Sequence, residues 1–348
     1  MSGGLVPEVA GVLSAEEVRA SAEHLASLQV PSGMIPWFPG GHCDPWNHVE
    51  SAMALDIGGL HHHAEDAYEW LAAVQRDDGS WHNYYWPDGS VEEAKLDTNV
   101  CAYVATGVWH HWLWTWDRAF LDHLWPTVER ALDWVLSLRR PDGLALWAVE
   151  ADGTQPWDYA LLSGTCSIQH ALRCGHALSD VVGEPRPDWA AAADVMGAAV
   201  VGRPDAFEPK DRWAMDWYYP VLSGALTGAA AKTRLSDGWD TFAMEGKGIR
   251  CVADEPWVTA SETAECSLAF ATIGDRATAT ELLAWTRAHR LDSGAYLTGL
   301  VHRPGQEPVR FPFDEHTSYT AAAVILAADA IAGSSPASAL FTPRPLLD

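Results

Sequence analysis

Carboxylates and aromatic residues recur together at the start of apolar segments along the chain. The first group lies in the stretch GGHCDPWNHVESAM, which begins like a loop and ends like a helix. Six groups each contain a carboxylate, and most contain an aromatic residue: Asp44, Trp46, Asn47, His48 and Glu50; Glu92, Glu93, Asp97 and Asn99; Trp157, Asp158 and Tyr159; Asp216, Trp217, Tyr218 and Tyr219; Asp254, Glu255, Trp257, Glu262 and Glu265; and Asp314, Glu315 and His316. An acid in front of a helix is commonly its N-cap. Capping needs no aromatic neighbour, so the recurrence of Trp and Tyr indicates a further role.

Paired carboxylates beside aromatic rings suit the hydrolysis of a glycosidic bond. One carboxyl group protonates the leaving oxygen, and the other activates water or attacks the anomeric carbon. A carboxyl group that acts as an acid at neutral pH needs a pKa raised by burial or by a neighbouring carboxylate. We expect Asp44 and Glu262 to be catalytic, with Glu50 and Asp97 as the next candidates. The sequence leaves open which residue is the acid, and whether configuration is inverted or retained.

The other members of these groups are candidates for binding a sugar. Aromatic rings stack on the C–H faces of sugars, and polar side chains bond their hydroxyl groups. The predicted stacking platforms are Trp46, Trp217, Tyr218 and Trp257. The predicted polar contacts are Asn47, His48, Asn99, Asp158, Tyr159, Asp216, Glu255, Asp314 and Glu315. Few basic residues accompany them, which favours a neutral oligosaccharide or polysaccharide.

Helical periodicity dominates the chain, and no segment alternates with period two for long enough to predict a sheet. Outer segments rich in charge alternate with inner segments rich in small and apolar residues. The predicted outer and inner helices alternate over residues 14–28, 46–57, 60–75, 96–115, 117–139, 159–182, 187–201, 217–235, 237–242 (a short, degenerate outer segment), 259–273, 276–290 and 317–332. Six such pairs predict an all-α fold, an (α/α)6 toroid. We expect residues 1–348 to form a single domain, with irregular tails at 1–13 and 334–348.

A turn with Asp or Ser before Gly, followed by an aromatic residue, recurs after the outer helices. One copy, Gln75-x-x-Asp78-Gly79-Ser80-Trp81, resembles the QW motif of squalene-hopene cyclases, and the toroid of protein prenyltransferase subunits is similar. Glycine supplies the positive φ after the helix, Asp caps and Trp packs over the turn. The motif therefore predicts a toroid without indicating its chemistry.

Other motifs resemble those of sugar-cleaving toroids. Residues 96–134, from LDTN through DRAF to WPTVERALDW, are similar to a hairpin of bacterial glucoamylases, which are six-hairpin glycosidases. The stretches DPWNHVE, MDWYYPVL and DEPWVTASETAE resemble a family of actinobacterial proteins commonly labelled prenyltransferases on domain similarity. This second resemblance implies endo-acting hydrolases of intracellular α-linked polysaccharides, including the methylmannose polysaccharides of mycobacteria.

Composition limits the partners and the compartment. The formal net charge of −25 disfavours nucleic acids and anionic membranes. There is no segment long and apolar enough to span a bilayer and no secretion signal, so we expect a cytoplasmic protein. The six cysteines lack a C-x-x-C pair and are expected to be buried and reduced, and the 19 Trp residues fit a sugar ligand.

Rival interpretations lack supporting motifs. Protein prenyltransferases resemble one another in a zinc site with an Asp-x-Cys pair, class II terpene cyclases carry Asp-x-Asp-Asp, and neither pattern occurs here. His42, Asp44, His48 and Glu50 could gather a metal, but no second cluster matches them, so we expect no metal and no cofactor. An isoprenoid enzyme of the same fold and a non-catalytic carbohydrate-binding protein remain the alternatives. The protein could be a monomer or a homodimer.

Overall fold

The computed structural model describes residues 6–155 and 157–341, which divide into two compact units. Unit 1 comprises residues 1–28, 54–60 and 210–348, and unit 2 comprises residues 29–53 and 61–209. The prediction of one domain over residues 1–348 stays a prediction. Of the expected tails, residues 6–13 and 334–341 contain neither helix nor strand, whereas residues 1–5 and 342–348 lie outside the described part. No described helix is long and apolar enough to cross a membrane.

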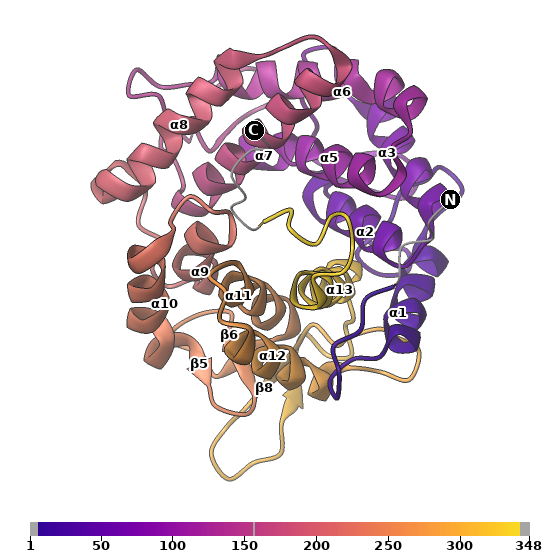
Figure 1. The fold of residues 1–348 in the computed structure, drawn as a ribbon, viewed down its shortest axis with the longest axis vertical. Coiled ribbons are helices and arrows are strands. Elements are labelled where there is room, and N and C mark those ends of the chain that lie inside the picture. The colour runs from indigo at the N-terminus through magenta and orange to yellow at the C-terminus, as the bar shows by residue number, and fades with distance from the viewer. Residues whose placement is uncertain (1–5, 156, 342–348) are drawn as a thin grey trace. The chain divides into compact units, whose positions relative to one another are not determined.

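Unit 2 is built mainly from long helices packed side by side. Its elements are the first part of α2 (Pro45–Ile57), α3 (His61–Val74), α4 (Thr98–Ala102), α5 (Val104–Thr115), α6 (Arg118–Ser137), α7 (Leu162–Val182), α8 (Pro187–Gly202) and the 3-10 helix η1 (Pro204–Ala206). α7 contacts α5 on one side and α8 on the other (Figure 1). Small residues such as Gly175 permit this approach, because Leu132 and Trp189 fill the space that a Cβ would need.

Unit 1 pairs buried helices with more exposed ones. Its helices are α1 (Ala15–Leu28), the end of α2, α9 (Ala214–Leu222), α10 (Gly228–Phe242), α11 (Ala260–Thr272), α12 (Arg276–Trp285), the 3-10 helix η2 (Thr286–His289) and α13 (Ser318–Ala332). α11 contacts α9, α12 and α13, and α13 also contacts α1 (Figure 1). The alanine-rich α13 is buried over most of its length, as expected of an inner helix.

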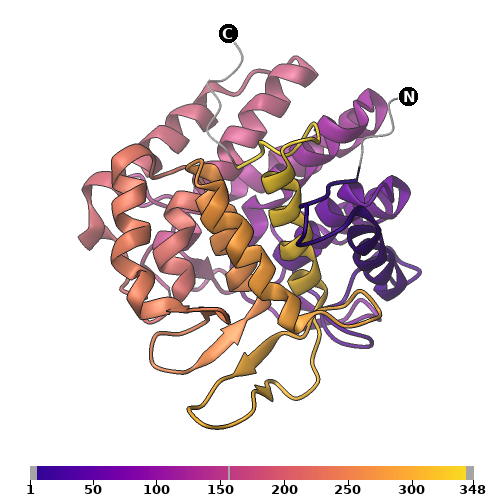
Figure 2. The ribbon, with the colours of Figure 1, turned by 60° about the horizontal axis from the view of Figure 1, so that its bottom comes forward.

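The structure also contains short strands, and these were not predicted from the sequence. The strands are β1 (Tyr84–Tyr85), β2 (Val91–Glu93), β3 (Leu96–Asp97), β4 (Ala148–Val149), β5 (Ala243–Met244), β6 (Gly248–Arg250), β7 (Trp257–Thr259), β8 (Gly299–Val301) and β9 (Val309–Arg310). β5 to β9 form one antiparallel sheet in sequence order, from which a long loop protrudes at the bottom of Figure 2. Strands of two or three residues are too short to show an alternating pattern, which explains the omission.

Two predicted helix boundaries were wrong. The segment predicted as one helix over 217–235 belongs to two helices: α9 ends at Leu222, and α10 begins at Gly228. Gly224 has a φ of 72° in the intervening turn, a conformation that interrupts a helix. The segment predicted over 96–115 begins as strand β3, whose Leu96 pairs with Val149 of β4. In both places the apolar composition continues through a change of backbone conformation.

In each recurring turn, the glycine packs against the next outer helix. A Cβ built on Gly33 would lie 2.1 Å from the carbonyl oxygen of Asp66 on α3, and one on Gly79 would lie 2.4 Å from that of Arg130 on α6. A Cβ on Gly294 would lie 2.5 Å from the carbonyl oxygen of Ala20. Since all three glycines have positive φ, both the conformation and the close approach require glycine.

The second copy of this turn also confirms the predicted packing of its tryptophan and shows a further contact of its glutamine. The Gln75 amide donates to the carbonyl oxygens of Gly79 and Thr127, each at 2.9 Å. Trp81 is buried, and its indole N–H donates to the carbonyl oxygen of Leu71 at 2.9 Å. The QW-like sequence thus joins the end of α3 to α6.

Two similar turns distinguish the two reasons for glycine, which are its positive φ and the close approach of a helix backbone. Asp78-Gly79-Ser80 and Asp88-Gly89-Ser90 have the same hydrogen bonds from the Ser amide and hydroxyl to Asp Oδ1, and glycine φ values of 95° and 84°. Nothing lies within 4 Å of a Cβ at Gly89. We expect Gly89→Ala to lower the free energy of unfolding by about 1 to 2 kcal/mol, the cost of a left-handed residue. Gly79→Ala should lose about 1 to 3 kcal/mol more through overpacking. Equal losses in urea unfolding would contradict the packing role.

Candidate active site

Asp44 begins α2 in unit 2 and is held by three hydrogen bonds. The Asn47 amide N–H donates to Oδ1 at 3.0 Å, while the Trp37 indole and the Asn47 side-chain amide donate to Oδ2, each at 2.7 Å. The residue is therefore an N-cap, as the structural interpretation of an acid here requires. Burial nevertheless raises the pKa of Asp44 above its usual range, against the effect of these donors. Asp44 is thus a fixed carboxyl group in a largely desolvated place.

Glu50 lies further along α2 and is buried with Asp44. Its Oε1 accepts hydrogen bonds from the Trp46 indole at 2.9 Å and the Tyr103 hydroxyl at 3.4 Å. Among the described residues, none donates to Oε2. Burial, together with the charge of Asp44, raises the pKa of Glu50 to about 8. Glu50 consequently carries a proton at neutral pH, while Asp44 keeps the donors that favour its ionised form.

Asp97 is a third buried acid of unit 2. It caps α4 by accepting from the amides of Asn99 at 3.1 Å and Val100 at 3.4 Å. Burial raises the pKa of Asp97 to about 6, although the charge of Lys95 opposes the shift. The Lys95 ammonium lies 4.6 Å from the centre of the Trp147 ring, so this cation is stacked on an aromatic face.

Several aromatic residues beside these acids were not predicted as site residues. The Tyr84 ring lies 5.7 Å from Trp37 and 4.6 Å from His42, centre to centre. Burial and the charges of Asp44, Glu93 and Asp97 raise the pKa of Tyr84, so its hydroxyl stays protonated. The sequence contains one signal that could have identified such residues: an aromatic residue follows the glycine turns, as Trp37 and Trp147 do. This residue was predicted only to pack over the turn.

Two residues predicted to bind sugar serve the protein's own packing. Both ring nitrogens of His48 are engaged, Nδ1 with the Ile35 amide at 3.1 Å and Nε2 with the Ala67 carbonyl at 2.8 Å. Burial lowers the pKa of His48 to about 4, so the ring is neutral. The ring of Trp46 stacks on Tyr103 at 4.3 Å and is buried. These positions suit a positioning role better than an open platform.

The other predicted residues of unit 2 are more accessible. Asn47 and Asn99 are half-buried beside the acids that they contact, and Asp158 is exposed. Tyr159 is half-buried, and its ring stacks on Trp147 at 5.7 Å. Asn47, Asn99 and Tyr159 therefore join the same acid and aromatic neighbourhood, whereas no described contact ties Asp158 to it.

Glu262 stands in the first turn of α11 in unit 1. Its Oε2 accepts hydrogen bonds from the hydroxyl groups of Thr259 and, at 2.8 Å, Ser261. The Cys251 thiol also lies against this carboxylate, and burial together with the charge of Glu262 raises the pKa of the thiol. Glu262 is half-buried. It is thus a carboxylate held on one oxygen by neutral donors. Asp44 belongs to the other unit, so the pairing of the two stays a prediction.

Tyr218 connects a second acid to this neighbourhood. Its hydroxyl donates to Glu265, one turn after Glu262 on α11. Burial and the charges of Glu265 and Glu262 raise the pKa of Tyr218, so the residue is a buried donor. Asp216 is buried near the start of α9.

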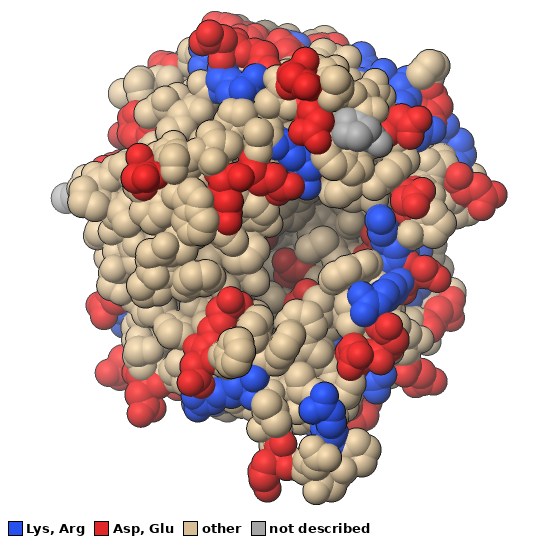
Figure 3. Space-filling model, turned by 180° about the vertical axis from the view of Figure 1, so that it is seen from behind, with Lys and Arg blue, Asp and Glu red and all other residues tan. Residues whose placement is uncertain are grey.

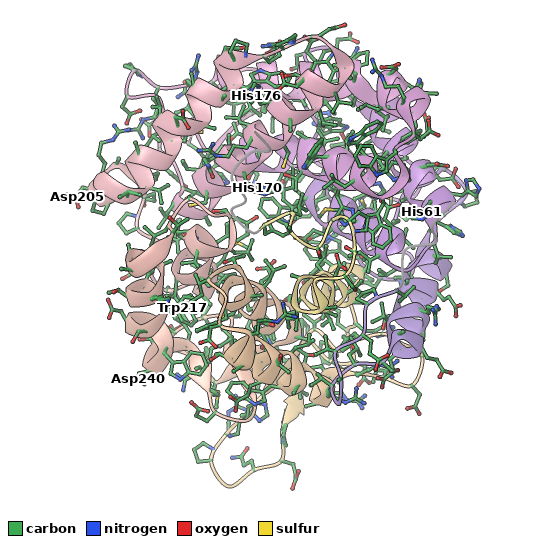
Figure 4. The ribbon with its side chains drawn as sticks, in the orientation of Figure 1. His61, His170, His176, Asp205, Trp217 and Asp240 are labelled. Carbon is green, nitrogen blue, oxygen red and sulfur yellow. The ribbon has the colours of Figure 1, made fainter. Side chains whose placement is uncertain are left out.

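Trp217 lies in the contact between α9 and α10 (Figure 4). Its indole N–H donates to the carbonyl oxygen of Arg234 at 2.7 Å, and its ring stacks on Phe242 at 5.3 Å. The tight fit leaves no room for a side chain at Gly238, whose Cβ would lie 2.2 Å from the indole nitrogen. The predicted platform is therefore part of the helix packing.

The remaining predicted residues of unit 1 lie on or beside the five-stranded sheet. Trp257 is half-buried on β7, and its indole donates to the Phe311 carbonyl at 3.2 Å. Glu255 is exposed in the preceding turn, and exposed Asp314 pairs with Arg310. Glu315 accepts a hydrogen bond from the Thr298 hydroxyl at 3.0 Å. Trp257 is thus the predicted platform that keeps an accessible position.

No cluster of three or more His, Cys, Asp or Glu residues that could hold a metal occurs in the described ranges. The six cysteines are all free and buried, which confirms the predicted burial of the thiols. The His42 ring pairs with Glu92 at 2.8 Å instead of joining a ligand set with Asp44.

No family model matches the chain, but individual proteins do. The "MMP endo-(1,4)-3-O-methyl-alpha-D-mannosidase" of Mycolicibacterium hassiacum is 48% identical over 336 residues, which cover 97% of this chain and 92% of that protein. An uncharacterized glycosyl hydrolase of Methanocaldococcus jannaschii is 23% identical over 143 residues, covering 40% of this chain and 22% of that protein.

Solved structures with the same fold include both hydrolases and an isomerase. A glycosidase variant in complex with glucose has a TM-score of 0.73 at 13% identity and covers 92% of this chain and 97% of its own. A mannosylglycerate hydrolase from Thermus thermophilus has a TM-score of 0.68 at 14% identity, covering 88% and 99%. A D-mannose isomerase has a TM-score of 0.66 at 12% identity, covering 90% and 96%.

These similarities confirm the predicted all-α (α/α)6 toroid, and they replace the prenyltransferase label with a carbohydrate-active family. The structural matches carry the fold, because toroids with similar helices support different reactions. The sequence match carries the relationship, since it extends over nearly the whole chain. The chain belongs to the glycoside hydrolase family of the MMP endo-(1,4)-3-O-methyl-α-D-mannosidase.

Proposed function

We propose that this chain is an endo-acting α-mannosidase that cleaves (1→4) linkages within a 3-O-methylated mannan. The observation that carries the proposal is the 48% identity to a protein whose name states this activity. The alignment covers 336 residues, so it is not confined to one of the two units. The acids and aromatic residues of both units suit a neutral sugar, which needs carboxyl groups for chemistry and rings for stacking.

Asp44 and Glu262 are the proposed catalytic carboxylates. In glycoside hydrolysis, one carboxyl group gives a proton to the leaving glycosidic oxygen while the other assists the attack at the anomeric carbon. Asp44 is supported by its fixed orientation and its burial. Glu262 is supported by neutral hydroxyl donors that orient it without an ion pair among the described residues. Glu50 and Asp97 are the next candidates.

Glu50 has a distinct role in this proposal. Its raised pKa of about 8 means that Glu50 is protonated at neutral pH beside the buried Asp44. The neighbourhood of Asp44 therefore avoids two adjacent negative charges, which burial would make unfavourable. We propose that Glu50 stores this proton and thereby allows Asp44 to ionise.

The family relationship does not itself indicate a cellular compartment. The six free, buried cysteines are consistent with a reducing compartment, where structural disulfides are rare. We therefore keep a cytoplasmic location as part of the proposal.

Substitution of the proposed catalytic acids should abolish hydrolysis. For Glu262→Gln we expect kcat on a 3-O-methylated α-(1→4)-mannan to fall by at least about 100-fold, the usual contribution of acid–base catalysis. Asp44→Asn should lose as much, and also some stability, because an amide offers only one acceptor to the Trp37 and Asn47 donors. Product chromatography measures cleavage, and urea unfolding checks the fold.

Glu23→Gln is the matched control, because Glu23 is exposed on α1. It should retain wild-type activity. Hydrolysis by Glu262→Gln at the wild-type rate would contradict the assignment of that residue. A wild-type protein that is retained by the polysaccharide but never cleaves it would instead support the non-catalytic alternative.

Glu50→Gln should change how stability depends on pH. A glutamate in the unfolded chain titrates near 4.5, whereas folded Glu50 titrates near 8, so the folded state binds more protons between these values. The free energy of unfolding contributed by Glu50 is therefore greatest below about pH 4.5 and is lost as the pH rises through about 8. Relative to the wild type, Glu50→Gln should gain at least about 1 kcal/mol between pH 5 and pH 9, since one pKa unit is worth about 1.4 kcal/mol. A constant difference in urea unfolding would contradict the raised pKa.

A further inference from the structure

The loop between β8 and α13 carries exposed apolar side chains on unit 1. Val309 is 52% exposed, Phe311 50% and Phe313 88%. The loop protrudes from the five-stranded sheet in Figure 2, and uncharged residues, drawn in tan, lie beside charged ones at the bottom of Figure 3. Packing within the protein does not account for an almost fully exposed phenylalanine, because burying such a ring is favourable.

The backbone of Phe313 makes this exposure more informative. Its φ of 42° lies in the left-handed region, and it occupies the first central position of a turn closed by the Glu315 amide and the Pro312 carbonyl at 2.9 Å. Glycine, asparagine or aspartate is normally found at such a position. Phenylalanine is therefore retained at a backbone position that disfavours it, which points to a role for its side chain.

Trp116 provides a contrast within the same chain. It is also exposed, at 65%, and has a φ of 52°. Its conformation, however, ends α5, where its amide donates to the Trp112 carbonyl at 2.9 Å. A left-handed residue at the end of a helix is ordinary. The turn of Phe313 ends no helix, so this explanation does not extend to Phe313.

The loop is fixed to the sheet on both sides of Phe313. The Phe311 amide donates to the Gly299 carbonyl at 3.0 Å, and the Phe311 ring meets Trp257 edge to face at 5.3 Å. After the turn, the Glu315 carbonyl accepts from the Thr298 amide at 2.9 Å. Because these bonds hold both ends, the exposed ring is presented by an anchored loop.

The same sheet leads directly to Glu262. Trp257 begins β7, and Thr259 ends that strand and donates its hydroxyl to Glu262. β7 pairs with β8, and β8 pairs with β9, which leads into Phe311. Trp257, Phe311 and Phe313, which we name the aromatic strip, are thus continuous with the Glu262 carboxylate through adjacent strands.

We propose that the aromatic strip binds the polysaccharide chain beyond the linkage that is cleaved. This inference rests on the proposed function, and it specifies a chain-binding region for that activity. Phenylalanine offers an apolar face without a polar group, which suits sugars whose hydroxyl groups are replaced by O-methyl groups. Trp257 adds a larger ring whose N–H is already bonded to Phe311, so it too presents an apolar surface.

The test uses Phe313→Gly, with Trp116→Gly as the matched control. Glycine suits both positive φ values, so neither substitution strains the backbone, and both remove an exposed aromatic ring. Initial rates are measured on a 3-O-methylated α-(1→4)-mannan and on the shortest methylated oligosaccharide that the wild type cleaves. We expect Phe313→Gly to raise KM for the polysaccharide by about 5- to 10-fold, the range of one aromatic contact. For the short substrate, kcat/KM should change less than about twofold.

Three outcomes would overturn the inference. They are an unchanged KM for the polysaccharide, an equal loss on both substrates, and the same loss in Trp116→Gly. A change of oligomeric state in size-exclusion chromatography, with unchanged polysaccharide kinetics, would assign the strip to a second copy of the chain instead.

Failure of the proposed function is recognised separately. If the wild type cleaves neither substrate, affinity electrophoresis through the same mannan decides the matter. Retardation of the wild type and of Trp116→Gly, but not of Phe313→Gly, would support the strip as a binding region. Equal mobility of all three proteins would overturn it.

Discussion

The close contact between a turn glycine and the next outer helix positions several residues of the candidate site. Gly33, Gly79 and Gly294 each approach a helix backbone so closely that no side chain fits. The chain that follows each turn then supplies site residues: Trp37 and Asp44 after the first, Tyr84 and Asp97 after the second, and Thr298 and Phe311 after the third. Because the turn fixes where each segment begins, an error in its packing would displace acids and rings together.

Capping and chemistry are not competing explanations for the acids in front of the helices. Asp44 caps α2 and Asp97 caps α4, yet burial raises the pKa of both. The amide N–H groups of a helix start are fixed donors that cost no reorganisation, so they orient a carboxylate where water is scarce. Capping therefore supplies the rigidity that acid–base chemistry requires, and the neighbouring Glu50 supplies a retained proton.

The sequence predicted the helices and the acids better than it predicted the rings. Helical periodicity placed α6, α7, α8 and α13 close to their observed bounds. An aromatic ring has no such pattern: Trp46 and Trp217 have polar neighbours in sequence, yet they stack on Tyr103 and Phe242. The ring on which each tryptophan stacks comes from a segment that is distant in the sequence. Local composition therefore cannot distinguish a packed ring from one that is open to a ligand. The short strands were missed because two or three residues cannot show an alternating pattern.

The toroid itself does not select the reaction, since hydrolases and an isomerase share it. The features of this chain that suit one reaction lie at particular sites on the scaffold: neutral donors around Glu262, the buried Asp44 and Glu50, and an exposed phenylalanine in a turn that favours glycine. Each of these features carries a cost in desolvation or backbone strain that a purely structural loop would avoid. The desolvation and the strain occur at the starts of buried helices and on the five-stranded sheet, whereas the outer helices pack in the usual way. This division allows one fold to be kept while the substrate changes.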